Sequence, residues 1–450
     1  MRARFPAGPL WAGPVLVLLL CARGHAARGE AYALVNARVV PVSGAAIDKG
    51  TLVMRDGLIE AVGADVRVPP DARVIDVKGM TVTPGLIDGF GGIGLPAPRG
   101  GGSGGAGGRG AASSPAPSGS PLAPQSLALD RIAAADALKA RDAGITTALV
   151  IPKDGVLPGQ SVLINLAGEK VEAMVLKEPA ALHLHLATLS RTYPGSLMGT
   201  MAYARQSLLD AAHYRDEWKA YEASPRGKRR PRYDSALAAW QDVVAGRELL
   251  VVTASRENDV RRALDLADEF KVRLALAGAP QAFRVAELIK SRKLPLLVSV
   301  NFDPPRAAPL LGTPDDEKDR HAIEDAERNP AELHKAGVVF ALVSGHAADF
   351  VAGVRKAIER GLPADVALRA VTLTPAEVLG VADRLGSLEA GKIADVVVWS
   401  GEPLTKDAKA RMVFVDGQLY EPEDKPEPRR GEGSPSPLPR AASPAPEVQP

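Results

Sequence analysis

Alternating apolar and polar residues mark both ends of the chain as β structure. The runs near the N-terminus are YALVNARVV, TLVMRDGLIEAVG and RVIDVKG, and those near the C-terminus are GKIADVVVWSG and ARMVFVDGQLYEP. An Asp-Gly pair between two such runs, as at Asp56-Gly57, predicts a hairpin turn. Because strands flank the middle of the chain on both sides, we expect residues 31–82 and 382–421 to build one small composite β-sandwich from both chain ends.

The middle of the chain, residues 83–381, alternates between strand-like and helix-like runs. Short apolar runs such as ITTALVIP, VRLALAG and LPLLVSV alternate with amphipathic stretches such as DRIAAADALKARDAG and ENDVRRALDLADEF. This order predicts a parallel sheet with crossover helices, and the length suits a closed barrel. The predicted fold class is therefore α/β, a TIM-like (β/α)8 barrel with the composite β-sandwich beside it.

Three stretches depart from this pattern. Residues 97–124 consist mostly of Gly, Ser, Pro and Ala, and residues 422–450 of Pro, Ser and charged residues. Neither stretch can bury a core, so we predict a disordered insertion and a disordered tail. Residues 201–240 are predicted to be a helical insertion with the basic turn SPRGKRRPR. A basic run this short is more typical of a solvated loop than of a nucleic-acid site.

Residues 1–27 have the organisation of a secretory signal peptide. Two arginines precede an apolar run from Leu10 to Ala22, and small residues follow it. The run is shorter than the roughly 20 residues of a membrane-spanning helix. We therefore predict export to a periplasm or to the extracellular space. The alternatives are a retained N-terminal anchor and lipid attachment at Cys21, which is disfavoured because Leu20 stands where a bacterial lipobox has Gly or Ala.

Charge and cysteine content exclude several kinds of function. The 450 residues carry 55 Lys and Arg against 53 Asp and Glu, a formal net charge of +2. That balance gives no electrostatic footprint for nucleic acid or for an anionic membrane surface. Cys21 is the single cysteine, so a disulfide framework and a thiolate metal cluster are both excluded.

The motifs at both chain ends resemble a known family. NARVVPVSG, TLVMRDGLIEAVG and VIDVKGMTVTPGLID resemble the N-terminal half of the amidohydrolase superfamily, and AVTLTPAEVLGVADRLGSLEAGKIADVVVWSGEPL with MVFVDGQLY resembles its C-terminal end. The middle of the chain is similar to the secreted, imidazolonepropionase-like branch. The resemblance covers residues 32–420 and implies a metal-dependent hydrolase fold, a distorted barrel with a composite β-sandwich.

The resemblance also implies a metal centre, which this sequence does not reproduce. In the family, divalent ions held by His and carboxylate side chains at the C-terminal ends of barrel strands activate water and polarise the scissile carbonyl. The family's first strand carries PGLID, one residue and then His-x-His, and those two ligand positions here hold Phe90 and Gly92. Neither side chain binds a metal. Gly85 and Asp88 persist and are interpreted as structural turn residues.

The other ligand positions are altered as well. The strand LLVVTASRENDV places Thr253 and Ser255, and the strand VRLALAGAPQAF places Ala277, where the family has ligands. In VVFALVSGHAAD, Gly345 stands at the position of the family's metal-binding and proton-shuttling Asp, with His346 retained beside it. We therefore assign no catalytic residue at the family positions.

Three histidines offer a relocated site. His183 and His185 form a His-x-His in ALHLHLA, and on a strand both would face one side, a spacing that suits a pair of metal ligands. A structural or exposed pair is the simpler interpretation. His346 is expected at the barrel mouth as a further candidate ligand or as a hydrogen-bonding residue. No cofactor is predicted, and zinc or another divalent metal is expected only if such a relocated site exists.

Two hypotheses of function follow. The resemblance places the protein with hydrolases that act on carbon–nitrogen bonds other than peptide bonds, with catalysis impaired by the altered ligands. The alternative is a non-catalytic protein that binds a small molecule or partners an active amidohydrolase paralogue. Loss of the metal removes both nucleophile and electrophile, which favours a pseudoenzyme. Family members often dimerise, so a homodimer is one expected assembly, whereas neither nucleic acid nor a membrane span is expected.

Overall fold

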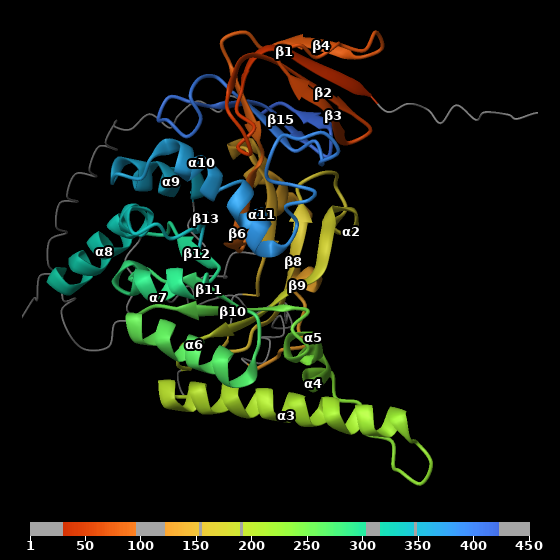
Figure 1. Ribbon diagram of the computed structural model, residues 1–450, viewed down its shortest axis with the longest axis vertical. Coiled ribbons are helices and arrows are strands. Elements are labelled where there is room, and N and C mark those ends of the chain that lie inside the picture. Colours follow the sequence, from red (N-terminus) through yellow and green to blue (C-terminus); the bar gives the residue numbers. More distant parts are fainter. Residues whose placement is uncertain are drawn as a thin grey trace, which may run out of the picture.

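The computed structural model contains a barrel sheet surrounded by helices and a second sheet at one end of the barrel (Figure 1). It describes residues 30–95, 122–152, 155–189, 192–302, 316–345 and 349–422. The predicted signal peptide, nearly all of the predicted insertion and the tail from residue 423 lie outside these ranges. Within them, no helix is both long and apolar enough to cross a membrane.

Eight strands lie in chain order in the barrel sheet. They are β6 (Leu86–Gly91), β7 (Ile145–Val150), β8 (Gly159–Asn165), β9 (Val175–His185), β10 (Leu249–Ala254), β11 (Leu274–Gly278), β12 (Leu296–Ser299) and β13 (Ala341–Val343). All neighbours are parallel except β8, which runs antiparallel to β7 and β9. The predicted TIM-like barrel is confirmed, with β8 as its one distortion. Strand β8 is antiparallel to β7 because the link at 151–158 is too short for a parallel crossover.

Most of the helices lie on the outside of the barrel (Figure 1). In chain order they are η1 (Ala128–Arg131), α1 (Ala134–Leu138), η2 (Lys139–Ala143), α2 (Val171–Met174), α3 (Leu197–Ala223), α4 (Ser235–Ala239), α5 (Gln241–Val244), α6 (Glu257–Phe270), η3 (Ala282–Val285), α7 (Ala286–Ser291), α8 (Asp316–Lys335), α9 (Phe350–Glu359), α10 (Ala364–Ala370) and α11 (Leu373–Leu379). The run DRIAAADALKARDAG is not one helix as expected. The backbone is extended at Ile132 and Ala133, and Ala133 N donates to Gly94 O instead.

Strands from both chain ends share the second sheet, as predicted. The N-terminal strands are β1 (Ala31–Val39), β2 (Ile47–Arg55), β3 (Leu58–Gly63), β4 (Arg73–Asp76) and β5 (Thr81–Pro84), and the C-terminal strands are β14 (Val396–Trp399), β15 (Ala410–Val415) and β16 (Gln418–Tyr420). The two groups join where β5 pairs with β14. Asp56-Gly57 and Asp416-Gly417 form the expected hairpin turns, with positive φ at all four residues.

Apolar side chains fill the inside of the barrel. Strand residues such as Leu149, Val251 and Leu297 form one buried cluster with Ala376 and Leu379 of α11. Helix α11 therefore closes the end of the barrel at which the parallel strands begin, and leaves the opposite end as the mouth.

A buried carboxylate joins the first and last barrel strands. Asp88 Oδ1 on β6 accepts hydrogen bonds from Ser344 N, just after β13, and from Phe90 N. Gly345 N donates to Phe90 O at 3.0 Å across the same seam. Burial raises the pKa of Asp88. The interpretation of Asp88 as a turn residue is wrong, because it lies within a strand and its side chain closes the barrel.

A second buried carboxylate joins the two sheets. Asp395, next to β14, accepts hydrogen bonds from Asp416 N at 2.9 Å, from the Thr147 hydroxyl at 3.1 Å and from the Asn165 amide at 3.4 Å. Thr147 lies on β7 and Asn165 on β8, so this carboxylate connects the composite sheet to the barrel. Burial raises the pKa of Asp395 to about 6, although the hydrogen bonds act in the opposite direction.

We expect Asp395→Asn to remove a pH dependence of stability. The folded chain holds the proton of Asp395 up to about pH 6, whereas an unfolded Asp loses it near pH 3.9. Since the folded state binds more protons between these values, the free energy of unfolding falls as the pH rises through this window, by on the order of 3 kcal/mol from this group. Asparagine keeps an acceptor for Asp416 N and carries no charge.

Denaturant unfolding of both proteins from about pH 4 to pH 7 measures this difference. The exposed Asp48→Asn on β2 serves as the control and should keep the wild-type slope. An equal decline in Asp395→Asn and in the wild type would show that Asp395 does not carry the effect.

Candidate functional site

The described residues at the family's ligand positions lie at the carboxyl ends of the barrel strands, and so do the candidate ligands His183 and His185. Phe90 lies on β6, His183 and His185 at the end of β9, Thr253 on β10 and Ala277 on β11. Of the remaining positions, Gly92 directly follows β6, Ser255 directly follows β10, and Gly345 lies two residues after the end of β13.

The strand register places three of these residues side by side. Thr253 on β10 pairs with His185 on one side and with Ala277 on the other. Alternate residues of a strand face the same side, so His183 and His185 share the inner face of β9. His183 is fully buried, whereas His185 is partly exposed nearer the mouth.

Phe90 fills space at the first of the family's ligand positions. Its side chain is 4% exposed and belongs to the inner apolar cluster, together with Ile87. The β6–β7 register shifts between Asp88 and Gly91, and such a bulge allows Ile87 and Phe90 to face the same interior. The ring centroid of Phe90 lies 5.9 Å from that of His183. The imidazole therefore packs against an aromatic ring at this level of the barrel.

Gly345 leaves no room for the family's carboxylate. Its φ of 54° is in the left-handed region. A Cβ placed on it would overlap Ser299 Oγ and lie 2.7 Å from Ser299 Cβ. Its carbonyl oxygen accepts a hydrogen bond from Asn301 Nδ2 at 3.3 Å. The present packing therefore requires glycine here. His346, the next residue, lies outside the described residues.

These residues do not fit the metal centre that the resemblance implies. Among the family's ligand positions, only Thr253 and Ser255 have a side-chain oxygen, and both oxygens belong to neutral hydroxyl groups. The family's ligands are imidazoles and carboxylates. Asp88 is held by backbone N–H groups at the barrel seam. Across the described ranges, no group of three or more His, Cys, Asp or Glu is placed to hold an ion. We therefore derive no reaction step through a metal.

Neutral polar groups remain near the mouth. Thr253 Oγ1 is buried and has no hydrogen-bond partner among the residues that the structure describes. Ser299 Oγ accepts a hydrogen bond from Asn301 N at 3.1 Å. Together with His183 and His185, these groups supply hydroxyl, amide and imidazole donors and acceptors. These side chains are hydrogen-bonding groups and do not form a set of carboxylate ligands.

Two residues of this region, Ser299 and Asn301, were missed by the sequence analysis. Both shape the end of β12, and Ser299 blocks a side chain at Gly345. The signal that was available is the position of both residues at the end of the apolar run LPLLVSV, because polar residues there lie at the carboxyl edge of a barrel strand. No pattern in the neighbouring sequence predicts the contacts of Ser299 and Asn301 with the segment after β13.

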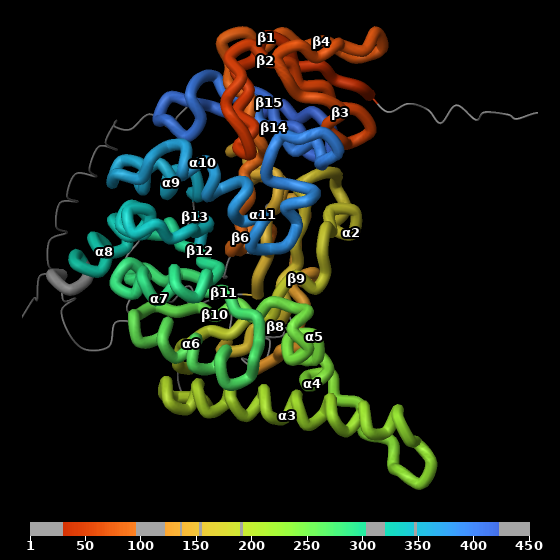
Figure 2. Tube along the Cα trace, viewed as in Figure 1, coloured from red at the N-terminus to blue at the C-terminus, as the bar shows by residue number. Residues whose placement is uncertain are grey.

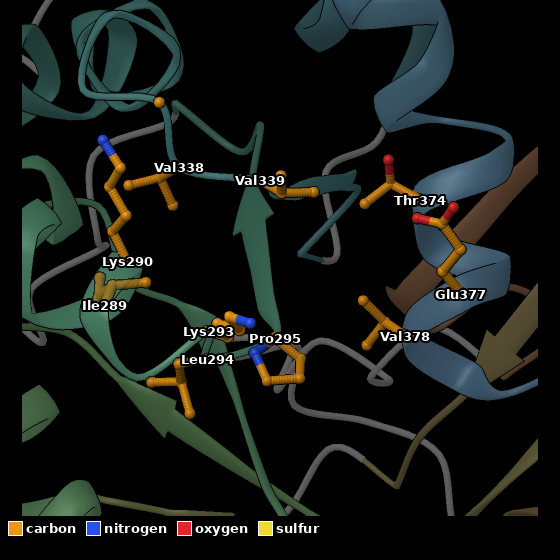
Figure 3. Close-up of a pocket in the computed structure, with 11 residues that line it drawn as sticks. Ile289, Lys290, Lys293, Leu294, Pro295, Val338, Val339, Thr374, Glu377 and Val378 are labelled. Atoms are coloured by element: carbon orange, nitrogen blue, oxygen red, sulfur yellow. The ribbon is translucent and has the colours of Figure 1, made fainter.

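A separate cavity of about 500 Å³ opens at the other end of the barrel (Figure 3). Its apolar lining comes from α7, α11 and the segments before β12 and β13, and consists of Ile289, Leu294, Pro295, Val338, Val339 and Val378. Lys290 and Lys293 lie on one side and Glu377 on the other. Lys290 Nζ donates to Ala336 O, and Glu377 pairs with Arg369. This cavity lies between α7 and α11 and is not part of the candidate site.

Comparison with known proteins identifies the family. The model of the amidohydrolase family matches residues 286–420. Over 165 residues the chain is 31% identical to amidohydrolase tasK of Hapsidospora irregularis, a match that covers 36% of this chain and 16% of that relative. The crystal structure of an amidohydrolase from Thermotoga maritima MSB8 covers 87% of this chain and 100% of its own, with a TM-score of 0.73 and 25% identity. The chain belongs to the amidohydrolase superfamily.

More distant amidohydrolase-like structures show the fold alone. Ochratoxinase of A. niger covers 87% of this chain and 96% of its own at 16% identity, with a TM-score of 0.53. The match to tasK spans 16% of that relative's length, so the activity of the whole relative is not carried over. Of the altered ligand positions, only Gly345 falls within residues 286–420.

Restoring the family's carboxylate with Gly345→Asp should destabilise the protein. The new Cβ would meet Ser299 and the backbone would keep a left-handed φ, so we expect the free energy of unfolding to fall by about 2 kcal/mol. Adding Ser299→Gly should recover part of this loss, because it removes the overlapping Oγ and Cβ.

Gly44→Asp is the matched control, since no atom lies within 4 Å of a Cβ placed there. We expect it to stay within about 0.5 kcal/mol of the wild type in denaturant unfolding. Equal stability of Gly345→Asp and Gly44→Asp would contradict the packing argument.

Proposed function

We propose that this protein is a non-catalytic member of the amidohydrolase superfamily that binds a small polar ligand or partners an active relative. The proposal rests on one observation above the others. The buried ring of Phe90 packs against His183 where the family's first ligand pair would begin. The same part of the barrel is occupied by apolar packing rather than by a set of ligands.

The chemistry of the family supports this conclusion. Hydrolysis of a carbon–nitrogen bond by this route requires an activated water and a polarised carbonyl, and both depend on a bound divalent ion. A cation placed beside Phe90 and Ala277 would be desolvated without compensating ligands. The neutral groups of Thr253, Ser299 and Asn301 can orient a polar molecule but supply no charge to activate water.

A hydrolase with a relocated metal is the second candidate function. His183 and His185 favour it, because they share the inner face of β9 with the spacing of a ligand pair. In that case the third ligand would be a residue such as His346. Export, predicted from residues 1–27, is compatible with either function.

We expect the purified protein to retain no stoichiometric metal after exposure to Zn²⁺ or Mn²⁺ and dialysis, as measured by elemental mass spectrometry. Dihydropyrimidine, imidazolone and dipeptide substrates should not be hydrolysed above the rate without protein in the same metal-supplemented buffer. The physical reason is that the family's ligand positions carry no imidazole or carboxylate.

Three histidine variants separate the two functions. Metal content or turnover that disappears in His183→Ala and His185→Ala, but persists in the exposed His213→Ala on α3, would overturn the proposal and establish the relocated site. Binding of a polar ligand that is weakened in Thr253→Val, with no turnover in any variant, would support the non-catalytic function.

A further inference from the structure

Helix α3 forms an arm that extends beyond the barrel. Figure 1 shows it running beneath α6 and α4, and Figure 2 shows the turn at its far end standing clear of the rest of the chain. Its 27 residues correspond to a length of about 40 Å. The turn at 224–234 connects α3 to α4 and contains the basic run SPRGKRRPR.

Several contacts fix the conformation of this turn. Lys228 Nζ donates to Ala220 O at 2.7 Å, and its backbone N–H donates to Pro225 O at 3.2 Å. The guanidinium of Arg230 lies 5.5 Å from the ring centroid of Trp218, a cation–π contact. The cationic side chains therefore extend from an ordered turn that is held against the end of the helix.

The turn concentrates positive charge. Its five cations are all exposed, and they are Arg226, Lys228, Arg229, Arg230 and Arg232. None of the five forms an ion pair with a residue that the structure describes. Five positive charges exceed the formal net charge of +2 for the whole chain, so the rest of the protein is slightly acidic. The near balance of the whole sequence conceals this local excess.

The nearest acidic residues in the sequence do not neutralise the turn. Asp216 pairs with Arg215, and Glu217 with His213. Asp234 accepts hydrogen bonds from the first backbone N–H groups of α4. Glu222, at the end of α3, is exposed. The five cations therefore face solvent as one group.

We propose that this basic tip binds the anionic headgroups of a lipid surface. The tip is convex and projects from the molecule, so it can touch a flat surface while the slightly acidic body stays away from it. Tyr233, beside the cations, is 70% exposed, and an exposed tyrosine suits the level of the headgroups. Clusters of four or more Lys and Arg residues are typical of segments that bind anionic lipid headgroups by electrostatic attraction.

Nucleic acid fits this surface less well. A nucleic-acid site needs a stripe or face of cations that follows the phosphate backbone. Here five cations are gathered in one turn, and the helix behind it mixes Arg215 and Lys219 with Asp216, Glu217 and Glu222, so that no stripe of positive charge continues along the helix. Lipid headgroups diffuse laterally and can gather around a small tip, whereas phosphates along a strand are fixed in spacing.

Vesicle co-sedimentation of the full chain tests the proposal. We expect binding to vesicles that contain phosphatidylglycerol, little binding to pure phosphatidylcholine vesicles, and a steep loss of binding as salt is added. The variant Arg226→Gln, Lys228→Gln, Arg229→Gln, Arg232→Gln keeps the Arg230–Trp218 contact. Its affinity should fall at least about a hundredfold, since each cation near an anionic surface contributes roughly fivefold.

A matched variant neutralises four exposed cations elsewhere in the chain, namely Lys49, Arg67, Lys78 and Lys406. It should bind the anionic vesicles nearly as well as the wild type, and both variants should keep the wild-type unfolding midpoint. Equal losses in the two variants, or equal binding to neutral vesicles, would overturn the proposal. Tighter binding to duplex DNA or RNA than to the anionic vesicles at the same salt would overturn it in favour of nucleic acid.

Discussion

The space enclosed by the eight barrel strands has to be filled, and this constraint links the fold to its chemistry. Side chains inside a closed sheet are cut off from water, so each inward position either packs against others or leaves a costly void. In a metal-dependent barrel the layer near the mouth holds ligands and an ion. Here inward positions near the mouth hold Phe90, His183 and Ala277, and the aromatic ring of Phe90 supplies volume.

The groups that close the barrel have a structural role and take no part in a reaction. The Asp88 carboxylate accepts two backbone N–H bonds at the seam between β6 and β13, and Gly345 contributes a third bond to the same seam. The position at which the family uses a catalytic Asp has thus become a tight backbone contact next to Ser299. This end of the barrel retains the family's architecture, with packing in place of ligands.

The sequence predicts the elements better than the contacts between them. The composite sheet and its two Asp-Gly turns follow from local patterns, and so do most barrel strands. The reversed β8 was not predicted, because a buried strand has the same apolar pattern in either direction. The seam was not predicted either, since Asp88 and Ser344 are separated by 256 residues. For the candidate site, the family motif predicts which residues occupy the ligand positions. The tilted ring contact between Phe90 and His183 and the block at Gly345 arise only from tertiary packing.

The composite sheet imposes an order on folding. Strand β5 pairs with β14, and the indole of Trp399 donates to the Thr83 hydroxyl across 316 residues of chain. While the chain is being synthesised, one edge of β5 therefore stays unpaired until the whole barrel has emerged, and such edges recruit other strands. A truncated chain that ends before Asp395 would lose the pairing of β5 with β14 and also the buried carboxylate that joins the composite sheet to the barrel. The last strands to be made thus complete a structure that the first strands begin.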